Sequence, residues 1–195
     1  MRIGRPSKIR SETTGFPRRR AHSGGFPNRQ AKLRPDAHTA SAVDMTKWPI
    51  PHPMQLALDA ARAAGAQGEV PIGAVIMKGD EVLSVAANRT RTPPDPTGHA
   101  EIVALREAAV KLGGERLTDC DLYVTLEPCA MCAGAISHAR IGSLYYAASD
   151  PKGGAVEHGA RVFEHPQALH RPEVYSGMGE AEAAEILRDF FKARR

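Results

Sequence analysis

The chain has few cysteines and no long apolar run. Three cysteines stand among its 195 residues, and two of them share one C-x-x-C motif, which argues against a disulfide framework. No apolar run reaches the roughly 18 residues of a membrane-spanning helix, and no segment resembles a secretory signal. We therefore expect a protein of the reducing cytoplasm without a membrane anchor.

Acidic residues are scarce in the first 44 positions. That segment holds 10 Lys and Arg against 3 Asp and Glu, a net charge of +7, whereas residues 45–195 hold 16 against 19, a net charge of −3. The overall net charge of +4 therefore reflects the N-terminal segment and not the rest of the chain. If residues 45–195 bind nucleic acid, they must do so through a local basic patch.

Residues 1–44 are rich in Arg, Ser, Thr, Gly and Pro and lack apolar periodicity, which predicts a disordered basic leader. Two other interpretations stay open. A transit peptide has a similar composition, and the gene prediction can begin too early, with the true start at Met45. Globular patterning begins directly after Met45, so we expect residues 45–195 to form the folded domain.

Helical and strand patterns alternate along this domain. A hairpin of strands followed by two strand–helix units predicts an α/β fold, a three-layer α/β/α sandwich with a mixed central sheet. Helices that start after strands bring their first residues to the C-terminal edge of the strands, where ligands bind in such sheets. Apolar spacing predicts helices over 53–65, Ala100–Leu112 and about 180–194, a further helix that starts near Cys129, and strands over 69–77, Glu81–Ala87, 122–126 and 141–148.

Two short motifs, H-A-E and P-C-A-M-C, carry reactive side chains. Cys129 and Cys132 are three residues apart, so on the first turn of a helix both sulfurs can reach one ion. The positive end of the helix dipole favours their thiolates. With His99 they make a three-ligand zinc set, and a catalytic zinc keeps its fourth position open for water. Glu101 can take a proton from that water and pass it to a leaving nitrogen.

Each motif alone has a simpler interpretation. A C-x-x-C motif can be a redox pair or half of a structural zinc site, and H-x-E can be a helix start with a surface glutamate. The two together, with Pro128 before the first cysteine and a predicted strand leading into it, favour a catalytic zinc. We expect Cys120 to be a small buried residue and not a fourth ligand.

The predicted C-terminal helix carries two phenylalanines and a basic end. We expect Phe190 and Phe191 to belong to the core. The alternative is that one of them, together with Arg194 and Arg195, contacts the bases and phosphates of an RNA.

These motifs extend into longer matches with a known family. The chain resembles bacterial tRNA adenosine deaminases of the TadA type, within the cytidine-deaminase superfamily. H-A-E and P-C-A-M-C are shared across the superfamily, whereas LEPCAMCAGAI, DPKGGA and the FF-plus-basic ending narrow the resemblance to the tRNA branch. The matching segments are VPIGAV (70–75), NRT (88–90), DPTGHAEIVALREAA (95–109), LYVTLEPCAMCAGAISHARI (122–141) and DPKGGA (150–155).

The resemblance implies a reaction and a site. The reaction is hydrolytic deamination of adenosine to inosine at the wobble position of a tRNA anticodon. The enzyme is a homodimer with one Zn²⁺ per subunit, and the anticodon loop binds near the subunit interface. His99, Cys129 and Cys132 would hold the zinc, and Glu101 would shuttle the proton. The base pocket would be formed by Asn88, Ala100, Val70 and Pro71.

Two other functions fit the same motifs. A free-base deaminase, such as a guanine deaminase, would use the same zinc site without RNA contacts, and turnover of guanine would identify it. A non-catalytic RNA-binding subunit with a structural zinc would have no need of Glu101. The basic C-terminus and the Ala-Met pair between the cysteines favour the tRNA enzyme.

Overall fold

The computed structural model describes residues 49–91 and 93–194. The leader predicted over residues 1–44 lies outside the described residues. Within the described residues, four α-helices and five strands follow one another, with a short 3-10 helix, η2, before the last strand. Their bounds are α1 (His52–Ala66), β1 (Gly73–Lys78), β2 (Glu81–Ala87), α2 (Ala100–Leu112), β3 (Asp121–Leu126), α3 (Ala130–Ala139), β4 (Ser143–Ala148), η2 (Val162–Glu164), β5 (Glu173–Ser176) and α4 (Glu180–Lys192).

The strands form one mixed sheet in the order β2-β1-β3-β4-β5. β1 runs antiparallel to both of its neighbours, whereas β3, β4 and β5 run parallel to one another. β2 and β3 therefore point the same way and end at the same edge of the sheet. The chain enters α2 after β2 and α3 after β3, so both helices begin at this edge.

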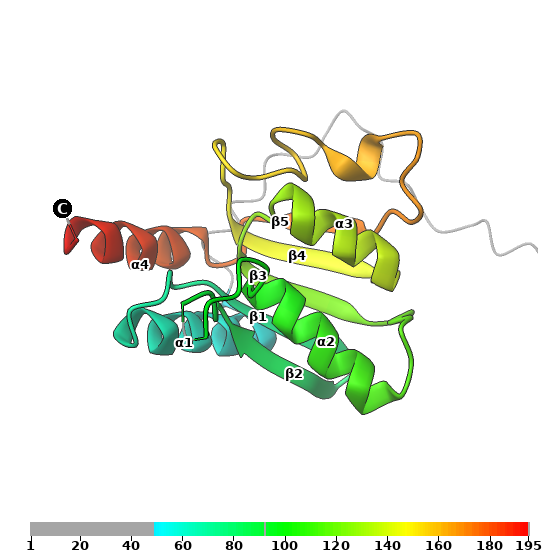
Figure 1. Cartoon of the computed structure of the whole chain (residues 1–195), viewed down its shortest axis with the longest axis horizontal. Helices are drawn as coiled ribbons and strands as arrows, with labels where there is room; N and C mark the ends of the chain where they lie inside the picture. Colours follow the sequence, from blue (N-terminus) through cyan, green and yellow to red (C-terminus); the bar gives the residue numbers. More distant parts are fainter. Residues whose placement is uncertain (1–48, 92, 195) are drawn as a thin grey trace, which may run out of the picture. The chain divides into compact units, whose positions relative to one another are not determined.

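The sheet lies between two pairs of helices, because its apolar side chains alternate between its faces. In β1, Ala74 and Ile76 join the core under α2 and α3, whereas Val75 and Met77 join the core under α1 and α4. The two helices of each pair also contact each other, and Figure 1 shows α2 beside α3. The predicted three-layer α/β/α sandwich is confirmed.

The strand predictions differ from the structure at the start of β1, at the start of β4, which is Ser143 and not residue 141, and in the missing β5. The strand expected over 69–77 begins only at Gly73, whose partner is Ala87. Pro71 has no N–H to give to a ladder, and the Ile72 N–H bonds to the Val70 carbonyl at 2.8 Å instead. The edge strand β5 was not predicted, since it is short and its side chains are mostly exposed without alternation. No helix in the described part of the chain is long and apolar enough to cross a membrane.

Candidate metal centre and groove

The loop that delivers His99 is closed at its base by hydrogen bonds. After β2, the Asn88 Oδ1 accepts the Ala100 N–H at 2.9 Å, and the Arg89 N–H donates to the Gly98 carbonyl at 2.7 Å. A Cβ on Gly98 would overlap the Arg89 carbonyl oxygen, so only glycine allows this approach. His99 then precedes α2 in an extended conformation as its N-cap residue.

The cysteines stand at the start of α3. Cys129 is the N-cap residue, extended in conformation, and Cys132 lies in the first turn and is fully buried. The Ala133 N–H bonds to the Cys129 carbonyl at 2.8 Å, which begins the helix. The spacing that the sequence predicted is therefore present, with both thiols on the first turn.

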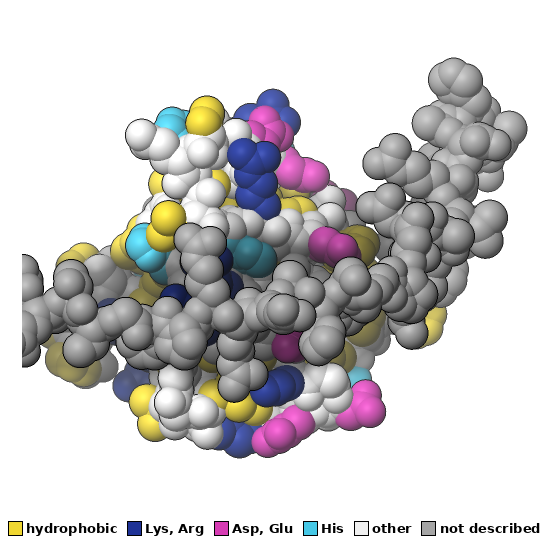
Figure 2. Space-filling model, turned by 90° about the vertical axis from the view of Figure 1, so that its right-hand side faces the viewer, with side chains coloured by type: hydrophobic (Ala, Val, Ile, Leu, Met, Phe, Trp, Pro, Cys, Tyr) yellow, Lys and Arg dark blue, Asp and Glu magenta, His cyan; other side chains and the backbone are white. Residues whose placement is uncertain are grey.

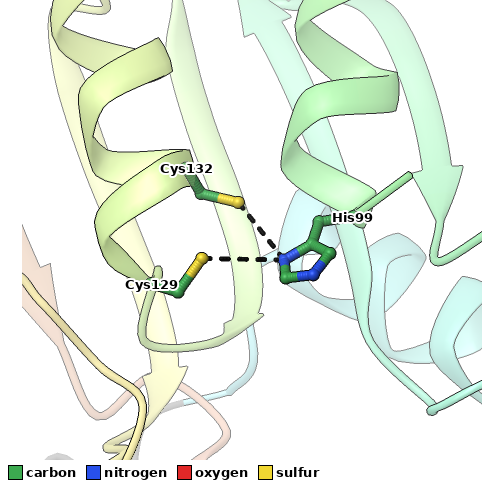
Figure 3. A group of neighbouring side chains, drawn as sticks. All are labelled: His99, Cys129 and Cys132. Atoms are coloured by element: carbon green, nitrogen blue, oxygen red, sulfur yellow. Dashed lines mark hydrogen bonds between the residues drawn. The ribbon is translucent and has the colours of Figure 1, made fainter. Parts of the chain in front are cut away.

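His99, Cys129 and Cys132 come together across the gap between α2 and α3 (Figure 3). The His99 Nδ1 lies 3.7 Å from the Cys129 Sγ and 3.5 Å from the Cys132 Sγ. All three donor atoms lie within 4.8 Å of one another, and no other His, Cys, Asp or Glu of the described residues completes the group. Cys120 is fully buried in the core, as expected. This trio can hold a metal ion.

The pKa shifts within the trio favour a thiolate at Cys129. Hydrogen bonds from the Cys132 thiol and from His99 lower the pKa of Cys129 to about 4, against the effect of burial, so this residue is a thiolate. The pKa of Cys132 is raised by its hydrogen bond with Cys129, by burial and by the charge of Glu101. The bond with Cys129 raises the pKa of His99, against burial. The negative charge at Cys129 favours a cation beside this thiolate.

Glu101 is a buried carboxyl beside the trio. Its residue is 4% exposed, on the first turn of α2. Burial raises its pKa, opposed by its own backbone N–H and by the charge of His99, while the charge of Cys129 raises it further. A carboxyl with a raised pKa can hold and release a proton nearer to neutral pH, as an acid–base catalyst must.

A groove opens at the same edge of the sheet, on the side of α4. Its volume is about 970 Å³. Val70 lines it, whereas Pro71 is buried and lines a separate cavity of about 300 Å³ behind α4. Neither the trio nor Asn88 is among the groove's lining residues, so the wall that the resemblance predicts around the base stays a prediction. The groove is lined by Val70, Leu126, Ala148, Ser149, Asp150, Lys152, Ala184, Leu187, Arg188, Phe191 and Lys192.

The two phenylalanines of α4 have different environments. Phe190 is 7% exposed and belongs to the interior, as expected, and the Arg194 guanidinium lies 3.6 Å from its ring centroid. Phe191 is 50% exposed and lines the groove, so the expectation that it is a core residue was wrong. The two are adjacent on a helix that covers the sheet with one face only, so they point to different sides. Arg195 lies outside the described residues.

Two buried carboxylates of the site were missed in the sequence analysis, Glu69 and Glu127. Each is under 10% exposed. Glu69 accepts the Thr90 hydroxyl and the Arg91 N–H, both at 2.8 Å, and so holds the segment after Asn88. Glu127 holds the loop after β4. The available signal was a glutamate that borders an apolar run close to a proline: Glu127 ends one run directly before Pro128, and Glu69 precedes another run two residues before Pro71.

Charge on the surface is mixed. On the face that Figure 2 shows, Lys and Arg side chains lie beside Asp and Glu side chains at the upper and lower ends of the view. This agrees with the net charge of −3 over residues 45–195. The groove itself is lined by three cationic residues, Lys152, Arg188 and Lys192, and by the acidic Asp150.

Comparison with known proteins gives one family and several close relatives. The profile of the MafB19-like deaminases matches residues 51–195. A tRNA-specific adenosine deaminase of Agrobacterium fabrum is 58% identical over 144 residues, which cover 74% of this chain and 95% of that protein. A tRNA-specific adenosine deaminase of Rickettsia bellii is 44% identical and matches 73% of this chain and 99% of its own length.

Solved structures show the same fold. One comes from studies of A-to-I editing by tRNA:A34 deaminases at the wobble position of transfer RNA. It is 59% identical, with a TM-score of 0.69, and covers 70% of this chain and 99% of its own. A guanine deaminase from Nitrosomonas europaea is 25% identical, with a TM-score of 0.62, and covers 71% of this chain and 82% of its own.

Proposed function

Because the chain belongs to the MafB19-like deaminase family, we propose that it deaminates adenosine to inosine at the wobble position of a tRNA anticodon. One observation carries this proposal. A His/Cys/Cys trio with a buried glutamate beside it stands in a chain 58% identical to a tRNA-specific adenosine deaminase. The reaction is a hydrolysis, in which water adds at C6 of adenine and ammonia leaves.

The donor set fits zinc. One imidazole and two thiolates are ligands that zinc prefers, and three protein ligands leave a position for water. We propose one Zn²⁺ per subunit, held by His99, Cys129 and Cys132. When bound, the ion lowers the pKa of water toward neutrality and so supplies a strong nucleophile.

Glu101 is the proposed proton carrier. It accepts a proton from the attacking water and delivers it to the amino group that leaves from C6. Its burial shields this exchange from bulk water. A scaffold with a structural zinc would gain nothing from a buried carboxyl with a raised pKa beside the ligands, which disfavours the non-catalytic alternative.

Asn88 is the proposed contact to the adenine ring. Because its Oδ1 accepts the Ala100 N–H, its amide group still has two N–H donors for a ring nitrogen of the base. Ala100 thereby helps to orient Asn88 in addition to its predicted contact near the base. We further propose that Val70 lies in the wall of the base pocket, as the resemblance implies, whereas Pro71, which lines the separate cavity, is not proposed as a contact.

The groove favours RNA over a free base. Lys152, Arg188 and Lys192 can pair with backbone phosphates, and the half-exposed ring of Phe191 can stack on an unpaired base. Anticodon-loop bases are unpaired, so they can enter such a groove without the cost of opening a duplex. A guanine deaminase would have no use for these contacts.

We also propose a homodimer that acts in the cytoplasm, with residues 45–195 as the deaminase domain. An apolar groove of about 590 Å³ between α2 and α3, with Ile102, Leu105 and Ala135 among its lining residues, supports a second copy as its cover. Ala135→Arg should then shift the mass in light scattering to that of a monomer. A chain that starts at Met45 should keep the wild-type rate of inosine formation.

The deciding experiment offers the zinc-loaded protein a tRNA with a wobble adenosine, with Glu101→Gln as the inactive control. Inosine is located by sequencing, and guanine is tested in parallel for ammonia release. Inosine confined to the wobble position supports the proposal. Ammonia from guanine without inosine would identify a guanine deaminase. Neither product, from protein that holds one zinc, would indicate a non-catalytic subunit.

A further inference from the structure

The Glu127 carboxylate has an unusually full set of donors. Its side chain is fully buried, between the end of β3 and the cysteine-bearing turn. Each of its oxygens accepts at least two hydrogen bonds, and every donor belongs to the loop after β4. The donors are the N–H groups of Val156 (3.1 Å), Glu157 (2.9 Å) and His158 (3.0 Å) to Oε1, and the Asp150 N–H (3.0 Å) and the His158 Nδ1 (2.7 Å) to Oε2.

The same loop also touches the cysteine-bearing turn directly. The Ala155 N–H donates to the Pro128 carbonyl at 2.9 Å, and Gly154 forms an isolated β-bridge with Cys129. A Cβ on Gly154 would lie 2.5 Å from the Glu127 Cδ, closer than any side chain tolerates. The loop therefore fits against the turn only with a glycine at this position.

The other end of the loop lines the groove. Asp150 and Lys152 are groove residues. The Asp150 Oδ1 accepts the N–H groups of Lys152 and Gly153 at 3.1 and 3.0 Å, which makes this end a tight turn. One loop thus connects the metal ligands to the groove.

Only a carboxylate satisfies all these donors. In a glutamine, the NH₂ group would face either the three N–H groups at one oxygen or the N–H and imidazole at the other. Either orientation places donors against donors in a buried site, which costs more than the loss of a single bond.

We propose that Glu127 is a positioning residue that fixes the 150–158 loop against the cysteine-bearing turn, so that the groove and the trio are held in one geometry. It touches neither substrate nor metal. The inference rests on the proposed function for its link to tRNA, but the coupling of the loop to the trio is a property of the protein itself.

The test uses zinc- and cobalt-loaded full-length protein with two variants. Glu127→Gln replaces one of the two acceptor oxygens by an NH₂ donor, and Gly154→Ala pushes the loop away while the carboxylate stays. Glu164→Gln is the matched control, because that carboxylate pairs with Arg161 on the surface nearby. Three quantities are measured: amide hydrogen exchange of the loop, the visible absorption of the cobalt protein, and KM and kcat for tRNA.

Both variants should speed exchange at the N–H groups that Glu127 accepts, by roughly tenfold or more. They should also change the cobalt spectrum and raise the KM for tRNA, whereas the control should match the wild type. Unchanged loop exchange, or faster exchange with an unchanged cobalt spectrum, would overturn the proposal. These two measurements need no tRNA, so they decide the coupling even if the wild type does not edit tRNA. If Glu127→Gln does not fold, Gly154→Ala decides alone.

Discussion

The candidate metal centre and the groove lie at one edge of the sheet but are built in different ways. The centre comes from two short motifs at helix starts, and its reactive groups are buried or half-buried. The groove comes from the segment before β1, the ends of β3 and β4, the following loop and α4, and several of its polar groups are exposed. Chemistry needs a few groups in fixed positions, whereas recognition of a long ligand is spread over many weak contacts.

The largest expected effect is at the centre. Glu101→Gln should lower kcat for tRNA by roughly 10²- to 10⁴-fold, the usual contribution of a positioned acid–base group. Zinc content and tRNA affinity should stay near wild type, because the substitution is isosteric and leaves the groove intact. Single-turnover inosine formation measures the rate, and a loss of less than about tenfold would remove Glu101 from its proposed role.

Substitution of a proposed metal ligand should remove the zinc itself, unlike the substitution of Glu101. Cys132→Ser should abolish stoichiometric zinc binding and, with it, activity, since zinc strongly prefers the thiolate in this set. Metal analysis after dialysis against a chelator measures the effect, with Cys120→Ser as the control that keeps its zinc. Full zinc occupancy in Cys132→Ser would contradict the ligand assignment.

Substitutions of the two adjacent phenylalanines should distinguish a groove residue from a core residue. Phe191→Ala should weaken tRNA binding by about 5- to 150-fold, which corresponds to roughly 1–3 kcal/mol for one stacked base, with little change in melting temperature. Phe190→Ala should instead lower the free energy of unfolding by roughly 3–5 kcal/mol. Binding and thermal unfolding of both variants test this, and equal effects of the two substitutions on melting would show that Phe191 is also structural.

The cationic residues of the groove should make tRNA binding depend on the salt concentration. Lys192→Ala should reduce the slope of log K against log salt concentration by about 0.7, as expected for one phosphate contact on a single strand, while kcat at saturating tRNA stays unchanged. Lys111→Ala is the control, because Lys111 pairs with Glu81 at the far end of α2. If the slope of log K against log salt concentration is the same for Lys192→Ala and the control, Lys192 contacts no phosphate.

The smallest effect concerns the sheet that supports both regions. Tyr123 stacks on Tyr145 with ring centroids 4.5 Å apart, and burial raises the pKa of Tyr123 to about 12. The unfolded chain ionises this group at its ordinary, lower pKa. The contribution of Tyr123 to the free energy of unfolding is therefore fully present below the ordinary tyrosine pKa. It should fall as the pH rises from that value toward 12. Urea denaturation against pH measures this, and Tyr123→Phe should show a shallower fall.

Local patterns predicted much of the fold. The bounds of β2 and α2 agree with the predicted ones, because strand alternation in the first and apolar spacing in the second extend to their ends. β5 escaped prediction because its pairing with β4, and not its own sequence, makes it a strand. The late start of β1 depends on Pro71 and on the hydrogen bonds around Ile72, which periodicity does not report.

The trio was predictable because each motif is local: the spacing of Cys129 and Cys132 lets both sulfurs reach one ion. The sequence by itself thus determined the three residues of the trio and the fold class. Only the tertiary structure decided that Phe190 is buried while Phe191 lines a groove, and that Glu127 holds a loop more than twenty residues further along the chain. Such assignments depend on contacts between distant segments, and no local pattern carries them.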